Sequence, residues 1–150
     1  MGSHIALAFV VGLIASSCAA SAPTATPGAA PSSRYFDNSG RDDVLAGGVK
    51  RIPIETPKGT FHVWTKRVGN NPRIKVLLLH GGPGMTHEYL GAFDSYFPAA
   101  GIEYYYYDQL GSFYSDQPDA PELWELPRFV DEVEQVRNCL LYTSPSPRDS

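Results

Sequence analysis

The sequence is poor in several features that would define a protein class by themselves. It has only two cysteines in 150 residues, which are too few for a disulfide framework. Its formal net charge is −4, so there is no excess of positive charge to favour nucleic-acid binding. No apolar run reaches the roughly 18 residues that a membrane-spanning helix requires. What is present, 43% hydrophobic and 12% aromatic residues, is typical of a globular protein rather than of a disordered chain.

The first 33 residues contain no Asp, Glu, Lys or Arg. They include an apolar stretch at residues 5–15, whose length suits the core of a signal peptide. Every residue from 19 to 33 is Ala, Ser, Thr, Pro or Gly, a composition that is typical of a flexible tether. We therefore predict a signal peptide over residues 1–18 and a flexible linker and lead-in over residues 19–49.

Cys18 follows two small residues directly after the apolar stretch, and this pattern resembles a bacterial lipoprotein cleavage box. The resemblance implies transfer of a diacylglyceryl group to the thiol, cleavage before Cys18 and anchoring by the acyl chains. Two alternatives stay open: an ordinary secretory signal with an incidental cysteine, and a miscalled start or cloning scar at residues 1–4. We expect an exported bacterial protein, either periplasmic or anchored to the membrane as a lipoprotein; the only membrane contact expected is through Cys18.

Residues 139–150 have no apolar periodicity and end in a Ser- and Pro-rich run. This peptide resembles the translation of a transposase-type sequencing adapter. The alternative is a genuine disordered tail. We expect the native sequence to end near Asn138 and Cys139 to have no functional role.

The segment between these ends has the pattern of an α/β fold. Two short segments at residues 50–55 and 60–66 flank a Pro- and Gly-containing turn, which predicts a β-hairpin. A nearly continuous apolar run at residues 74–79 predicts a parallel strand that is buried on both faces. A helix beginning at Thr86 or His87 follows, and then a strand at residues 102–107. The last element is a helix at residues 125–137, with its acids on the solvent face. Hairpin, then strand–helix–strand–helix, indicates a mostly parallel sheet.

The string His80-Gly81-Gly82-Pro83-Gly84 directly follows the apolar run. Ligands of open α/β sheets bind at the carboxyl ends of the strands, and glycines allow a backbone to approach a substrate closely. In α/β-hydrolases a loop of this type supplies a backbone N–H to the oxyanion hole. We expect Gly81 and Gly82 to supply that N–H, Pro83 and Gly84 to shape the loop, and His80 to be a structural, hydrogen-bonded histidine.

A second motif runs from Asp108 to Pro118, after the next strand. Together, the two motifs resemble the proline iminopeptidase family, peptidase family S33 of the α/β-hydrolases, over about residues 52–137. Many α/β-hydrolases carry D-x-x-G-x-G-x-S at this loop, whereas this chain has Phe113 at the second Gly position. The motif-supporting residues here are Asp108, Gln109, Gly111 and Ser115, and Asp108 is expected to hold the loop through hydrogen bonds. The resemblance implies that residues 50–138 are the truncated N-terminal half of an α/β-hydrolase fold.

The resemblance also implies a serine aminopeptidase that releases N-terminal residues, typically proline, from small peptides with a free N-terminus. No metal and no organic cofactor are implied. A Ser–His–Asp triad performs the catalysis, but the sequence contains no G-x-S-x-G string, so the nucleophile and the triad Asp and His are absent. A trio of Ser115, His87 and Asp116 has no motif support.

Two other functions remain open: another α/β-hydrolase, such as an esterase, lactonase or epoxide hydrolase, and a non-catalytic exported lipoprotein. Expressed as written, the 150-residue chain is expected to lack peptidase activity and to fold poorly.

Overall fold

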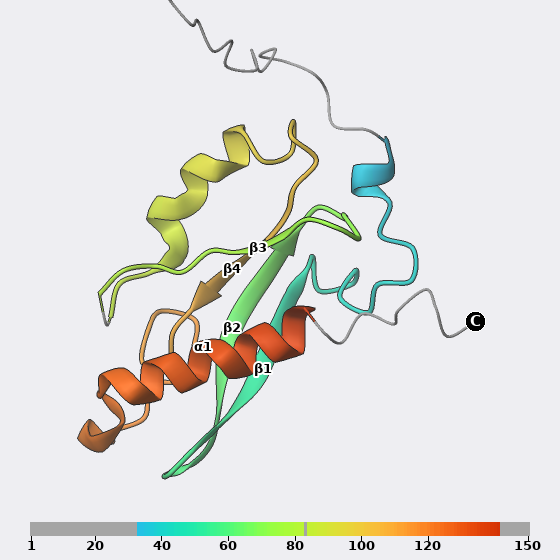
Figure 1. The fold of residues 1–150 in the computed structure, drawn as a ribbon. Coiled ribbons are helices and arrows are strands. Elements are labelled where there is room, and N and C mark those ends of the chain that lie inside the picture. The colour runs from blue at the N-terminus through green and yellow to red at the C-terminus, as the bar shows by residue number, and fades with distance from the viewer. Residues whose placement is uncertain (1–32, 83, 142–150) are drawn as a thin grey trace, which may run out of the picture.

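The computed structural model describes residues 33–82 and 84–141. Within them a four-stranded sheet is flanked by one long helix and three short 3-10 helices (Figure 1). In chain order the elements are η1 (Ser33–Phe36), β1 (Val49–Thr56), β2 (Gly59–Val68), β3 (Lys75–Leu77), η2 (His87–Ser95), β4 (Glu103–Asp108), η3 (Pro121–Leu123) and α1 (Leu126–Leu141). The residues from 33 to 141 thus form the α/β arrangement that the sequence predicts.

The hairpin predicted from the sequence is confirmed as β1 and β2. The two strands pair antiparallel, with Ile52 opposite Val63 and Thr56 opposite Gly59 at the turn. The Thr56 hydroxyl donates to the carbonyl of Gly59 at 2.7 Å, and Gly59 has a φ of +114°, which an L side chain rarely adopts. Alternate side chains point into the core, as the period of two requires.

The sheet has the strand order β1-β2-β4-β3. Strand β2 pairs antiparallel with β4, and only β3 and β4 are parallel. The expectation of a mostly parallel sheet is therefore wrong for this part of the chain, because the hairpin places β2 antiparallel against β4. Strand β3 covers three of the six residues predicted, is only half-buried and lies at the edge of the described sheet. Because β3 and β4 are parallel, the two sequence motifs, which follow these strands, lie at the same end of the sheet.

The helix expected after Thr86 is the 3-10 helix η2. In that geometry residues three apart share a face, so Leu90 and Phe93 both pack against the Tyr104 and Tyr106 side of β4. Tyr89 lies outside this face and is half exposed.

Helix α1 lies across one face of the hairpin (Figure 1). Val136 and Leu140 pack into a core with Ile52, Ile54 and Val63. The helix runs to Leu141, beyond the predicted end at residue 137.

One acid of α1, Glu132, is on the core side of the helix, which corrects the expectation that its acids all face solvent. Glu132 is fully buried. Its carboxylate accepts hydrogen bonds from the Tyr107 hydroxyl, the Leu110 amide at 3.0 Å and the Arg128 guanidinium. These three donors explain the burial, because a carboxylate is tolerated in a core only when it is paired.

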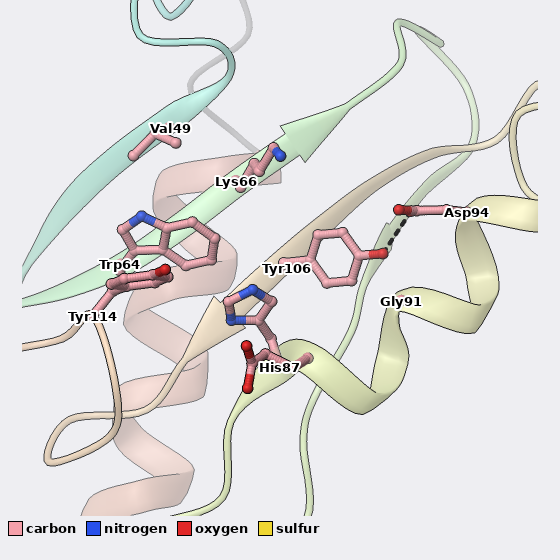
Figure 2. A pocket seen from close by; sticks show the side chains of 9 residues that line it. Val49, Trp64, Lys66, His87, Gly91, Asp94, Tyr106 and Tyr114 are labelled. Carbon is pink, nitrogen blue, oxygen red and sulfur yellow. Dashed lines mark hydrogen bonds between the residues drawn. The ribbon is translucent and has the colours of Figure 1, made fainter.

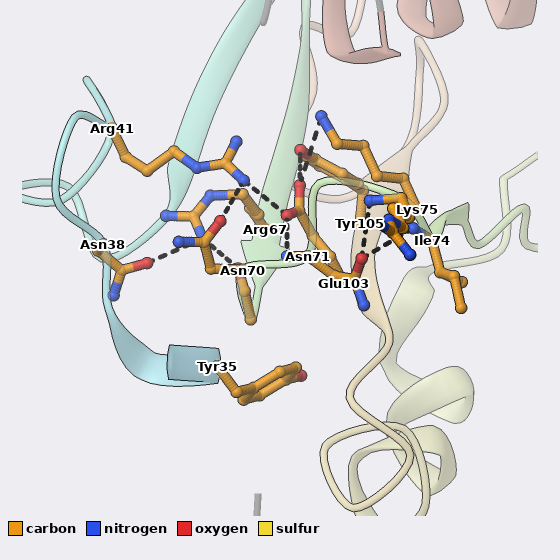
Figure 3. A network of polar contacts seen from close by, with 12 residues as sticks. Tyr35, Asn38, Arg41, Arg67, Asn70, Asn71, Ile74, Lys75, Glu103 and Tyr105 are labelled. Atoms are coloured by element: carbon orange, nitrogen blue, oxygen red, sulfur yellow. Dashed lines mark hydrogen bonds and ion pairs between the residues drawn. The ribbon is translucent and has the colours of Figure 1, made fainter. Parts of the chain in front are cut away.

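The lead-in segment is also more ordered than the sequence indicated, because residues 33–48 pack on the sheet. Arg67 of β2 donates to both oxygens of Asp43, at 2.9 and 2.6 Å, and both side chains are buried. Arg41 donates to the fully buried Glu103 of β4 at 2.6 Å (Figure 3). The polar residues of the lead-in thus pair with charged groups of the sheet.

Some predictions concern residues outside the described part of the chain. These are the signal peptide at residues 1–18 with its Cys18, residues 19–32 of the linker, Pro83, and residues 142–150 of the adapter-like end. Within residues 33–82 and 84–141, no helix is both long and apolar enough to cross a membrane.

Candidate active site

His80 lies at the end of the β3 segment and joins the two sequence motifs. Its ring is buried, and its Nε2 atom accepts a hydrogen bond from the Gln109 amide at 3.1 Å. Burial lowers the pKa of His80 below its ordinary value of 6.5, which favours the neutral ring that can accept this bond. His80 therefore fastens the start of the Gly-rich loop to the loop that follows β4.

Asp108, the last residue of β4, holds the far end of the same Gly-rich loop. Its Oδ1 atom accepts from the backbone N–H of His87 at 3.0 Å and lies 2.9 Å from the His87 ring nitrogen Nδ1. The carboxylate is fully buried, and its second oxygen has no partner among the described residues. Such a group is costly to bury, so its position indicates a specific role in shaping this loop.

The Gly-rich loop presents its amides between these two anchors. The Gly81 N–H donates to the hydroxyl of Tyr89 at 2.6 Å. The Gly82 N–H has no partner among the residues that the structure describes. Gly82 has a φ of +61°, a conformation that L side chains rarely adopt. Of the two amides predicted as oxyanion donors, that of Gly82 is therefore the open one.

The loop after β4 is fixed by the residues of the second motif. The Ser115 hydroxyl donates to the carbonyl of Asp108 at 2.6 Å and accepts from the Trp64 amide at 2.8 Å. The Ser112 hydroxyl donates to the carbonyl of Met85, which adds another link to the Gly-rich loop. At Gly111 a Cβ atom would lie 2.6 Å from the Trp124 ring, so only glycine fits there.

Phe113 occupies the position at which many hydrolases have glycine, and it has a φ of +35°. The backbone there adopts the left-handed conformation without the residue that adopts it most easily. The Phe113 ring packs on Tyr114, with the ring centroids 3.9 Å apart. The departure from the motif thus changes the residue type but keeps the glycine-like backbone.

The trio of Ser115, His87 and Asp116 is not brought together. His87 pairs with Asp108, while Asp116 accepts from the His62 amide at 2.7 Å and from Arg51. In the described ranges, no group of three or more His, Cys, Asp or Glu side chains could hold a metal ion.

A pocket of about 470 Å³ lies beside η2, on the face of β2 and β4 that carries Trp64 and Tyr106 (Figure 2). The His87 ring stacks on Trp64, with the ring centroids 4.6 Å apart. Asp94 of η2 accepts a hydrogen bond from the Tyr106 hydroxyl, and Lys66 adds a positive charge to the lining. The pocket is mixed in polarity and encloses no recognisable nucleophile.

Sequence reasoning missed the roles of His87 and Tyr89. Both act on partners at a distance in the chain, Asp108 and Gly81, and these contacts exist only because η2 folds back over the end of β4. The available signal was a His and a Tyr placed a few residues after the Gly-rich string.

Comparisons with known proteins identify the relatives of this arrangement. No family model matches the chain. The chain is 65% identical over 89 residues to a proline iminopeptidase of Elizabethkingia meningoseptica and 64% identical over 89 residues to one of Flavobacterium johnsoniae. Each match covers 59% of this chain and 30% of the relative. Over these residues the chain is similar to proline iminopeptidases.

A solved structure shows the same similarity. A proline iminopeptidase from Mycobacterium smegmatis superposes with a TM-score of 0.53 and 28% identity, over 61% of this chain and 31% of that one. Over that 61% of the chain, the fold is that of the corresponding part of an α/β-hydrolase. The chain spans about 30% of the length of the proline iminopeptidases that it matches.

Proposed function

We propose that the chain is the oxyanion-binding part of a serine aminopeptidase that releases N-terminal proline from small peptides. The observation that carries the proposal is the open Gly82 N–H, in a loop held at both ends, within a chain that is 65% identical to a proline iminopeptidase over 89 residues.

The chemistry follows from the loop. When a serine oxygen attacks the carbonyl carbon of the first peptide bond, negative charge develops on the carbonyl oxygen. A fixed N–H donor stabilises that charge more than it stabilises the neutral carbonyl, so it lowers the barrier. The His80 and Asp108 anchors hold the Gly82 N–H in place before the substrate arrives. The serine and its His and Asp partners come from sequence beyond the 150 residues in this proposal.

The test is a substrate panel with the complete protein encoded at this locus. Proline 2-naphthylamide is expected to be cleaved fastest, leucine 2-naphthylamide more slowly, and N-acetylproline 2-naphthylamide not at all because its amine is blocked. An esterase would instead hydrolyse 4-nitrophenyl butyrate and leave all three naphthylamides intact, and that result would contradict the proposal.

We further propose that the protein is exported and that its membrane contact is a lipid anchor on Cys18. The support is the apolar segment at residues 5–15, followed by small residues and then the cysteine. In cells fed an alkyne-tagged fatty acid, the wild-type protein is expected to incorporate the tag and to sediment with membranes. Cys18→Ser should abolish the labelling. Label retained by Cys18→Ser would refute the anchor.

A further inference from the structure

The hydroxyl of Tyr89 lies against the Gly-rich loop. It accepts the Gly81 N–H at 2.6 Å. Among the described residues this hydroxyl donates to no acceptor, so its own proton is available to a ligand. The side chain is 52% exposed, so solvent and ligands can reach it. Tyr89 thus places a free O–H donor at the amide next to the open Gly82 N–H.

The position of Tyr89 is fixed by contacts on both sides of it in η2. On one side, the His87 backbone and ring are held by Asp108. On the other, Leu90 packs against the core cluster of Tyr104 and Tyr106.

The far end of η2 is tied to the sheet as well. Asp94 accepts hydrogen bonds from the hydroxyls of Tyr104 and Tyr106, the latter at 2.5 Å. Burial raises the pKa of Tyr106, so its hydroxyl stays protonated and keeps donating. Because η2 is held at both ends, the Tyr89 hydroxyl needs little rearrangement when charge develops beside it.

We propose that Tyr89 is a catalytic residue that donates its O–H to the oxyanion, beside the Gly82 N–H. This inference rests on the proposed function. As the serine gives its proton to the triad histidine and its oxygen bonds to the carbonyl carbon, the π electrons of the carbonyl move onto the carbonyl oxygen, which accepts the two hydrogen bonds. When the intermediate collapses, those electrons re-form the C=O bond, the C–N bond breaks, and the amine leaves with the proton that the histidine returns. Tyr89 keeps its proton throughout.

The Gly81 N–H has a part in this arrangement. By donating to the Tyr89 oxygen it polarises the O–H group and makes it a stronger donor, as expected for a chain of hydrogen bonds. The alternative is that Tyr89 only fastens the loop. The two roles differ in what they affect, because a donor to the oxyanion acts on the transition state and hardly at all on the bound substrate.

The experiment compares Tyr89→Phe with Tyr96→Phe in the complete protein. Tyr96 is the matched control, because it lies directly after η2, is 70% exposed and loses the same hydroxyl. Tyr89→Phe is expected to lower kcat for proline 2-naphthylamide by roughly 10²–10³-fold with little change in KM, the usual cost of losing one oxyanion donor. Tyr96→Phe should match the wild type.

Two inhibitors separate the roles further. Prolinal, an aldehyde that forms a tetrahedral adduct with the serine, should bind Tyr89→Phe more weakly by a factor similar to the loss in kcat. Free proline, which forms no adduct, should bind both proteins equally. Unchanged kcat in Tyr89→Phe overturns the proposal. A parallel loss of proline binding, prolinal binding and melting temperature also overturns it, because that pattern indicates a fastening role.

The proposed function can fail separately. If the wild type cleaves only 4-nitrophenyl butyrate, the peptidase assignment is wrong and the same comparison of variants on the ester decides the role of Tyr89. If the wild type cleaves no substrate in the panel, both proposals are overturned.

Discussion

At the scale of single residues, the buried ring of His80 connects the Gly-rich loop to the next loop only while it is neutral. Its Nε2 atom accepts from the Gln109 amide, and a protonated ring would present a donor there instead. Because burial lowers the pKa of His80, the unfolded chain binds a proton more readily than the folded one. The stabilisation is therefore present above pH 6.5 and is lost as the pH falls through the lower pKa of the folded state.

His80→Gln removes this titration. Glutamine can keep an acceptor near the Nε2 position but does not titrate, so the variant should lack the acid-induced loss of stability that the wild type shows below pH 6.5. Urea unfolding of the complete protein at a series of pH values measures it. His62→Gln, which changes an exposed histidine, should keep the wild-type pH dependence. An identical pH profile for His80→Gln and the wild type would contradict the role given to His80.

The sequence was sufficient to place the two motifs in the loops that follow two neighbouring strands. A Gly-rich string after an apolar strand, and a motif after the next strand, each reflect the backbone conformation required at that point of the chain. It was not sufficient for Tyr89 or for the pairing of His87 with Asp108. Those contacts depend on where η2 docks, which a local pattern does not contain. Phe113 is a related case. Its residue type departs from the motif, but its φ of +35° is in the left-handed region, which the residue type alone did not indicate.

At the scale of elements, the lead-in segment before β1 is bound to the sheet by buried ion pairs. Asp43 accepts two hydrogen bonds from Arg67, and these bonds hold the pKa of Asp43 below its ordinary value. Sequence reasoning described this segment only as part of a flexible linker and lead-in. Polarity alone cannot show that Asp43 and Glu103 have arginine partners brought to them by the fold.

Removing Asp43 should therefore cost much more than removing its neighbour. Asp43→Ala leaves the buried Arg67 without its carboxylate and is expected to destabilise the protein by about 3 kcal/mol. Asp42→Ala removes only an exposed pair with Lys50 and is expected to cost under about 1 kcal/mol. Urea unfolding at pH 7 measures both. Equal, small effects would show that the lead-in segment adds nothing to the stability of the sheet.

At the scale of the whole molecule, the described sheet has an open edge at β3. Leu79, two residues after β3, lines an apolar pocket of about 260 Å³ together with Gln109, Phe129, Val130, Val133 and Glu134. An unpaired strand edge beside apolar side chains is a surface that tends to pair with another strand. The chain spans about 30% of its curated relatives, and the fold class of this part agrees with an α/β-hydrolase.

The central claim is that the loop at Gly82 binds the oxyanion of a proline-releasing hydrolase. Its most direct test is kcat/KM for proline 2-naphthylamide in the complete protein, compared with Gly82→Ala and Gly40→Ala. Both glycines have positive φ, +61° and +76°, so both variants carry similar backbone strain, but Gly40 lies in the lead-in segment away from the loop. We predict proline release by the wild type, little change in Gly40→Ala and a loss of roughly 10²-fold in Gly82→Ala. No proline release by the wild type, or equal activity of the two variants, would contradict the claim.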